Sequence, residues 1–106
     1  MIARDITVDQ AENILKAEKI LDSCKTILRQ RGEQYGDAEE LYQRTAELWT
    51  AFLGSQINDK DVCIMMSLMK LARLRQETDN PAVTKDSYQD AINYIALAEG
   101  LEEDGT

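Results

Sequence analysis

The chain has 106 residues, among them no histidine, one proline, five glycines and two cysteines. Without histidine there is no imidazole base, no histidine-ligated metal and no Ser-His or Cys-His nucleophile pair. Because proline and glycine are scarce and no segment alternates apolar with polar residues for long, the sequence favours helices over strands. The cysteines, Cys24 and Cys63, occupy apolar helix positions. This pattern indicates reduced core residues of a cytoplasmic protein.

Basic residues are also few, since 12 Lys and Arg stand against 20 Asp and Glu and give a net charge of −8. This excess argues against direct binding to nucleic acid or to a membrane surface, because their phosphates would be repelled. No apolar run is long enough to span a membrane, and no signal peptide is evident. A small phosphorylated ligand or a basic protein partner remains compatible with the charge. We expect a single domain over residues 1–106.

The spacing of apolar residues predicts four helices, at residues 8–31, 38–53, 59–76 and 85–99, followed by an acidic tail at 101–106. Thr7, Asp37 and Asn58 are the expected N-caps of the first three helices, and Gly54 is the expected end of the second. The fold class is therefore all-α.

The third predicted helix, DKDVCIMMSLMKLARLRQ, is apolar around nearly its whole circumference, which is typical of a central helix. The first predicted helix carries a long apolar stripe. One short chain is too small to cover both surfaces, so we expect a four-helix bundle completed by homo-oligomerisation. Lys70 and Arg73 share a face of the third helix, and buried cations require anions nearby.

Asp86 and Asp90 stand one turn apart on the fourth predicted helix. Paired carboxylates at this spacing can share a hard divalent cation. They could equally form a solvated acidic face, or salt bridges with Lys70 and Arg73. A ligand phosphate is the alternative partner for the two cations.

The connector R-G-E-Q-Y-G-D at residues 31–37 has two glycines that allow the backbone to turn. Arg31 and Tyr35 could reach a ligand from this loop. The alternative is a plain connector, with a glycine at the end of the first helix, Asp37 as the next N-cap and Tyr35 packed beneath it.

Four strings, R-G-x-x-Y-G-D, L-W-x-x-x-L-G, D-V-x-x-M-M-x-L-x-K-x-A-R and K-D-S-x-x-D-x-x-x-Y, occur in this order between residues 27 and 98. Together they resemble an uncharacterised family of small phage and prophage proteins. That family is distantly similar to the all-α nucleotide pyrophosphohydrolases of the MazG type.

This resemblance implies an oligomeric helical bundle in the host cytoplasm, which binds Mg²⁺ through acidic pairs and cleaves nucleoside triphosphates to monophosphate and pyrophosphate. It implies that Asp86 and Asp90 are the acidic pair of the later helix and that Lys70 and Arg73 bind phosphates. The chain departs from the MazG pattern because the earlier helix has no E-x-x-E. Asp61 is the one carboxylate in the comparable part of the third helix.

The sequence thus predicts a phage-type nucleotide-binding protein, in which Arg31 and Tyr35 close over the ligand. Whether it is an enzyme is left open; if it is, the reaction is Mg²⁺-dependent pyrophosphohydrolysis, with no catalytic residue assigned. The alternative is a non-enzymatic phage inhibitor of a host defence system. Such an inhibitor would sequester a nucleotide, or block the basic groove of a host protein with its acidic surface. A third interpretation is a structural bundle whose charged residues pair internally.

Overall fold

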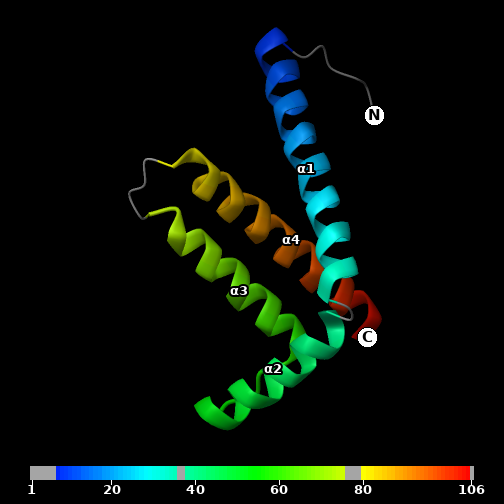
Figure 1. Ribbon diagram of the computed structural model, residues 1–106, viewed down its shortest axis with the longest axis vertical. Coiled ribbons are helices and arrows are strands. Elements are labelled where there is room, and N and C mark those ends of the chain that lie inside the picture. The colour runs from blue at the N-terminus through cyan, green and yellow to red at the C-terminus, as the bar shows by residue number, and fades with distance from the viewer. Residues whose placement is uncertain (1–6, 36–37, 76–79, 106) are drawn as a thin grey trace.

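The computed structural model describes the backbone of residues 7–35, 38–75 and 80–105, and their side chains except at 34–35 and 103–105. The helices are α1 (Val8–Tyr35), α2 (Ala38–Leu53), α3 (Asp59–Arg73) and α4 (Pro81–Gly105). Within these ranges there are four helices and no strand, which confirms the all-α prediction (Figure 1). None of the described helices is both long and apolar enough to cross a membrane.

Three of the expected helix ends are confirmed in detail. The Thr7 side chain accepts a hydrogen bond from the backbone N–H of Gln10, which closes a capping box before α1. Asn58 and Asp61 form a second capping box at the start of α3. Gly54 ends α2 with φ of 71°, a backbone conformation that glycine adopts without steric cost. The expected cap at Asp37 lies outside the described residues.

The connector after α1 was predicted wrongly in part. α1 continues to Tyr35, so Gly32 lies inside the helix and does not form a loop. A glycine within a helix costs only about 0.5–1 kcal/mol relative to alanine, which a 28-residue helix absorbs.

The start and end of α4 also differ from the prediction. α4 begins at Pro81, where the Asn80 side chain accepts a hydrogen bond from the backbone N–H of Ala82 at 3.0 Å. Proline is favoured at the first helical position because its missing N–H would have no partner there. The helix runs past the expected end, Gly100, to Gly105.

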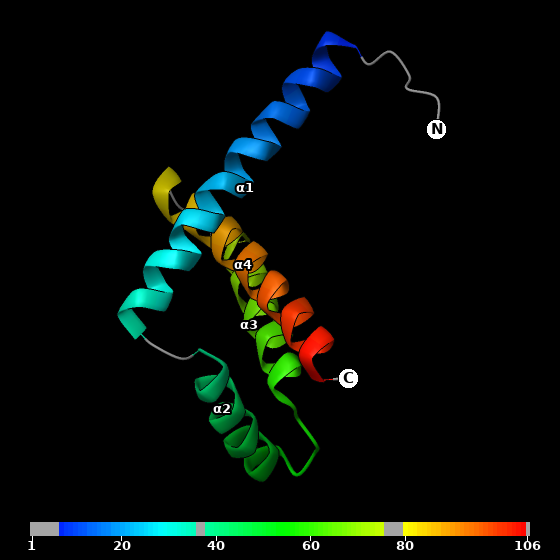
Figure 2. The same cartoon turned by 90° about the vertical axis from the view of Figure 1, so that its right-hand side faces the viewer.

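α3 and α4 share the centre of the fold, since each packs on two other helices. α4 packs along α3 and contacts α1, while α2 packs on α3 (Figures 1 and 2). Part of the apolar circumference of α3 nevertheless faces outward, and its exposed side chains are Ile64, Leu68, Met69 and Leu71. Two helices of the same chain therefore cover α3 only in part.

The four helices do not close into a compact bundle within one chain. The first half of α1 extends away from the other helices (Figures 1 and 2). The radius of gyration is 16.9 Å, against about 13 Å for a compact chain of this length.

The buried residues are mainly small or polar. The buried apolar residues are Cys24, Ala46, Val62, Cys63, Ala91 and Ala98, and the buried polar ones are Ser67, Ser87, Gln89, Asp90 and Asn93. The Ser67 hydroxyl on α3 donates a hydrogen bond to the backbone oxygen of Ala91 on α4, at 3.0 Å. Small side chains therefore allow α3 and α4 to approach closely, and α4 holds most of the polar interior.

Candidate functional site

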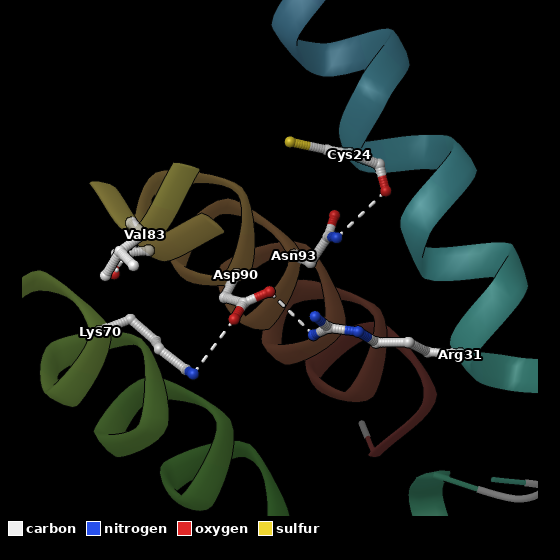
Figure 3. Close-up of polar contacts among 7 residues, drawn as sticks. Cys24, Arg31, Lys70, Val83, Asp90 and Asn93 are labelled. Carbon is white, nitrogen blue, oxygen red and sulfur yellow. Dashed lines mark hydrogen bonds and ion pairs between the residues drawn. The ribbon is translucent and has the colours of Figure 1, made fainter. Parts of the chain in front are cut away.

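Asp90 lies at the middle of α4 and joins three helices through its carboxylate. Its Oδ1 is 2.8 Å from Nη1 of Arg31 on α1, and its Oδ2 is 3.1 Å from Nζ of Lys70 on α3 (Figure 3). The Asp90 side chain is 7% exposed, that of Lys70 16% and that of Arg31 48%. The pair with Lys70 is therefore the buried side of this network, and Arg31 reaches it from solvent.

The two oxygens of Asp90 differ in how well they are satisfied. Although Arg31 Nη1 lies close to Oδ1, this buried oxygen accepts no hydrogen bond from the described residues. The contact is thus an ion pair without hydrogen-bond alignment, and such contacts are weaker than aligned ones. Oδ1 keeps a free acceptor position on a buried carboxylate.

Asn93, one turn after Asp90, fixes α1 against α4. Its side-chain amide donates a hydrogen bond to the backbone oxygen of Cys24 at 3.1 Å, and both residues are buried (Figure 3). Burial, with a smaller contribution from the Asp90 charge, raises the pKa of the Cys24 thiol, so the thiol is neutral at physiological pH.

A pocket of about 490 Å³ opens beside Asp90 between α1, α2 and α4. Its lining includes Leu28, Arg31, Tyr42, Asp90, Asn93 and Tyr94. The rings of Tyr42 and Tyr94 meet edge to face, with centroids 6.4 Å apart and an interplanar angle of 65°. Volumes of this order are usual for small-molecule sites, which combine apolar walls with a few polar groups.

The two tyrosines of the pocket act as neutral hydroxyls at physiological pH. Burial chiefly raises the pKa of Tyr42 to about 12. Burial, and secondly the Asp90 charge, also raises the pKa of Tyr94. Each phenol can therefore donate one hydrogen bond as well as offer a flat aromatic face.

The structure brings three of the predicted site residues together, namely Arg31, Lys70 and Asp90. Arg31 and Asp90 line the pocket, whereas Lys70 meets Asp90 from the α3 side. The salt-bridge interpretation of Lys70 is the one the structure contains. Arg31 acts from within α1 and not from a loop, and the side chain of Tyr35 lies outside the described residues.

Arg73 and Asp86 do not join the site. Both are exposed, and neither forms an ion pair with another described residue. One helical turn separates Asp86 from Asp90, yet only Asp90 faces α1 and α3. The internal salt bridges considered for Arg73 and Asp86 are therefore not formed among the described residues, and their roles toward a phosphate or a metal stay predictions.

The predicted magnesium ligands are not gathered in one place. Asp61 caps the start of α3, where its neighbour Lys60 pairs with Glu102 near the end of α4. Glu102 lies 12 residues beyond Asp90, or about 18 Å along a helix. Among the described residues no three or more Asp, Glu, Cys or His could hold a metal ion together. These residues do not fit a multi-carboxylate Mg²⁺ site.

The prediction from sequence missed Tyr42, Asn93 and Tyr94 as parts of the site. Asn93 and Tyr94 follow Asp90 by three and four residues, so they share its side of the helix. That spacing was a usable signal. Nothing in the spacing of α2 alone could have placed Tyr42 against Tyr94.

Residues 19–102 match a protein family described as a domain of unknown function, DUF6378. The chain belongs to this family. It is similar to the Gene 55 protein of Mycobacterium phage L5, with 33% identity over 85 residues that cover 78% of this chain and 52% of that protein. The Gene 55 protein of Mycobacterium phage D29 is 29% identical over 89 residues, which cover 83% of this chain and 56% of that protein. No solved structure matches the chain.

These matches confirm the predicted relation to an uncharacterised family of phage proteins, and the matched residues include the whole network around Asp90. The chain spans about half the length of the curated relatives it matches. The similarity to MazG-type pyrophosphohydrolases stays a prediction.

Proposed function

We propose that this DUF6378 protein binds a phosphorylated nucleotide in the pocket between α1, α2 and α4. The observation that carries the proposal is Asp90 Oδ1, a buried carboxylate oxygen on the pocket wall that accepts no hydrogen bond from the described residues. Arg31 Nη1 lies 2.8 Å from this oxygen without hydrogen-bond alignment, so a well-aligned donor would make a stronger contact. A ligand N–H group, such as those on the edge of a nucleobase, would supply such a donor.

Arg31 supports the phosphate end of the proposed ligand. Its side chain is half-exposed and lines the pocket, so its remaining N–H groups are available to an anion. Lys70 stays on Oδ2, and it keeps the charge of Asp90 compensated while Arg31 is shared with a ligand. Two cations and one carboxylate leave a local charge of +1 in a chain whose net charge is −8.

Tyr42 and Tyr94 support the base end of the ligand. Their rings give the pocket two differently oriented aromatic walls, against which a planar heterocycle can pack. Both phenols are neutral donors at physiological pH, and burial raises their pKa further above it. The pocket thus combines an acceptor, donors, a cation and flat apolar surface.

The proposal is binding, and hydrolysis is not part of it. Asp90 is the one carboxylate among the described residues that line this pocket, and it is already paired with two cations. No metal-dependent step follows from this donor set. Nucleotide sequestration, one of the inhibitor mechanisms considered above, requires only binding.

Isothermal titration calorimetry with nucleoside mono-, di- and triphosphates, with and without Mg²⁺, tests the proposal. We expect Arg31→Gln to weaken binding of the best nucleotide by about 10- to 100-fold, the scale of a charged hydrogen bond. The matching nucleoside, which has no phosphate, should bind the variant and the parent protein equally.

Arg73→Gln is the matched control, because it removes the same charge from an exposed arginine outside the pocket. It should leave the affinity unchanged. Equal weakening by both substitutions would contradict the proposed site. Absence of heat and of any rise in melting temperature at millimolar nucleotide would contradict nucleotide binding itself.

A further inference from the structure

A second surface of the molecule lies between the first half of α1 and the start of α4. It is a groove of about 740 Å³ whose lining includes Ile20, Leu21, Pro81, Thr84, Tyr88 and Ile92. Three of these apolar side chains remain about half exposed, with Ile20 at 43%, Leu21 at 54% and Tyr88 at 53%. We call this groove, together with Ile14 on α1, the open face.

The accessible surface of the chain is much larger than a folded monomer of its size requires. It measures 8523 Å², whereas a monomer of 12.0 kDa exposes about 6,000 Å². The excess of roughly 2,500 Å² is comparable to what each chain buries in a large obligate homodimer, and is well above the roughly 800 Å² per partner of a standard interface. A surplus of this order leaves ample surface for an interface with a second chain.

The open face belongs to an apolar stripe along α1, and the C-terminal part of this stripe already packs against α4. The stripe runs along α1 through Ile14, Ala17, Leu21, Cys24 and Leu28. Cys24 is buried where α1 meets α4, whereas Ile14 and Leu21 on the same stripe are exposed. Apolar residues at this three- and four-residue spacing suit contact with another helix.

Charge does not oppose a copy of the same helix as that partner. Between residues 8 and 25, α1 carries Asp9, Glu12, Glu18 and Asp22 against Lys16, Lys19 and Lys25. Four acidic and three basic residues give this segment a charge of −1, while the whole chain has −8. Two such helices can approach each other without the repulsion that the rest of the chain would cause.

We propose that the open face binds a second copy of this chain, with α1 of each copy lying in the groove of the other. The contact is a two-fold one, in which the same residues serve both chains. Two α1 helices and two α4 helices then form the closed bundle that one chain leaves open. This inference does not depend on nucleotide binding.

Sedimentation equilibrium of the full chain at tens of micromolar tests the pairing. We expect the mass of two chains for the parent protein, and of one chain for Leu21→Asp and for Ile14→Asp. Ile14 lies one turn before the groove residues of α1 and is 49% exposed, so a charge there should not unfold one chain by itself. Circular dichroism should show a helical Ile14→Asp chain whose melting temperature no longer rises with protein concentration.

Phe52→Asp is the matched control, since Phe52 is 88% exposed on α2, away from the groove. This variant should keep the mass of two chains. A dimer that survives both α1 substitutions, or one that Phe52→Asp dissociates, would overturn the proposal by placing the interface elsewhere. A parent protein with the mass of one chain would also overturn it and leave the groove to a different protein.

Discussion

The interior of the molecule and its open face differ in an unusual way. Small and polar side chains are buried in the interior, whereas large apolar side chains are exposed on the open face. By the interior we mean the buried residues where α4 meets α1 and α3, namely Cys24, Cys63, Ser67, Asp90, Ala91 and Asn93. The interior is small or polar, whereas the open face carries isoleucine, leucine and tyrosine in contact with solvent. Large apolar residues are ordinarily the ones inside a protein.

This difference shows that the residues that hold the helices in place are not the large apolar residues of the open face. In the interior, helix positions are fixed by a few directed contacts, such as those from Ser67 to Ala91 and from Asn93 to Cys24. Full burial of a leucine or isoleucine side chain stabilises by about 1.5–3 kcal/mol. The half-exposed side chains of the open face contribute only part of this free energy in one chain. The stability of one chain should therefore depend unusually strongly on its buried polar residues.

The largest effect should come from replacing Asp90. Asp90→Asn leaves Lys70, which is 16% exposed, without an anion, so we expect the free energy of unfolding to fall by about 2–4 kcal/mol. Urea denaturation followed by circular dichroism measures it. Asp86→Asn removes the same charge one turn away at an exposed position, and should change stability by less than about 0.5 kcal/mol. Similar losses for both would show that the burial of Asp90 has no energetic consequence.

Lys70 and Arg73 provide the second comparison, between a largely buried cation and an exposed one. Lys70→Met keeps an unbranched apolar stem but removes the cation from Asp90 Oδ2, with Arg31 still beside Oδ1. Because one partner remains, we expect a loss of about 1–3 kcal/mol, less than for breaking the buried pair completely. Arg73→Met should be nearly neutral in the same denaturation assay. Unchanged or increased stability of Lys70→Met would instead favour a cation kept for a ligand.

Local signals predicted most of the secondary structure. The capping boxes at Thr7 and Asn58 and the positive φ of Gly54 depend on residues close in sequence, so they could be recognised without tertiary information. The same signals failed at Gly32, where helix continuity outweighs the preference of glycine for turns. Asn80 before Pro81 was a readable start signal for α4 that the prediction overlooked.

Tertiary arrangement was beyond what periodicity could supply. A helix that is apolar all round is expected to pack against neighbours on several sides, but its sequence does not say whether those neighbours belong to the same chain. α3 packs on both α2 and α4, yet Leu68 and Met69 on it stay exposed. For the candidate site, the sequence named Arg31, Lys70 and Asp90, which the structure joins by ion pairs. It could not separate them from the exposed Arg73 and Asp86, because the spacings along the chain are equally suitable.

Alkaline pH should weaken the interior through its thiols and phenols. Burial, and secondly the Asp59 charge, raises the pKa of Cys63 from 9.0 to about 11. The unfolded chain therefore loses this proton first, so the stabilisation is complete below pH 9 and is lost as the pH rises from 9 through 11. We expect Cys63→Ala to reduce the loss of unfolding free energy over this range by about 1–2 kcal/mol, measured by urea denaturation at several pH values. Parallel pH profiles for the two proteins would contradict this assignment to Cys63.

The smallest effect tests whether a single hydroxyl fixes α3 against α4. Ser67 is 1% exposed, and its Oγ bonds to a backbone oxygen of another helix, so Ser67→Ala should cost about 0.5–1.5 kcal/mol. Ser23 also donates its hydroxyl to a backbone oxygen, that of Lys19 at 3.1 Å, but within α1 and in contact with solvent. Ser23→Ala should be neutral or slightly stabilising, because alanine has the higher helix propensity. Chemical denaturation of both variants, in parallel and at equal protein concentration, separates the two serines. Equal changes in the free energy of unfolding would mean that the buried hydrogen bond of Ser67 stabilises no more than the exposed one of Ser23. The contrast between the interior and the open face would then lose its basis.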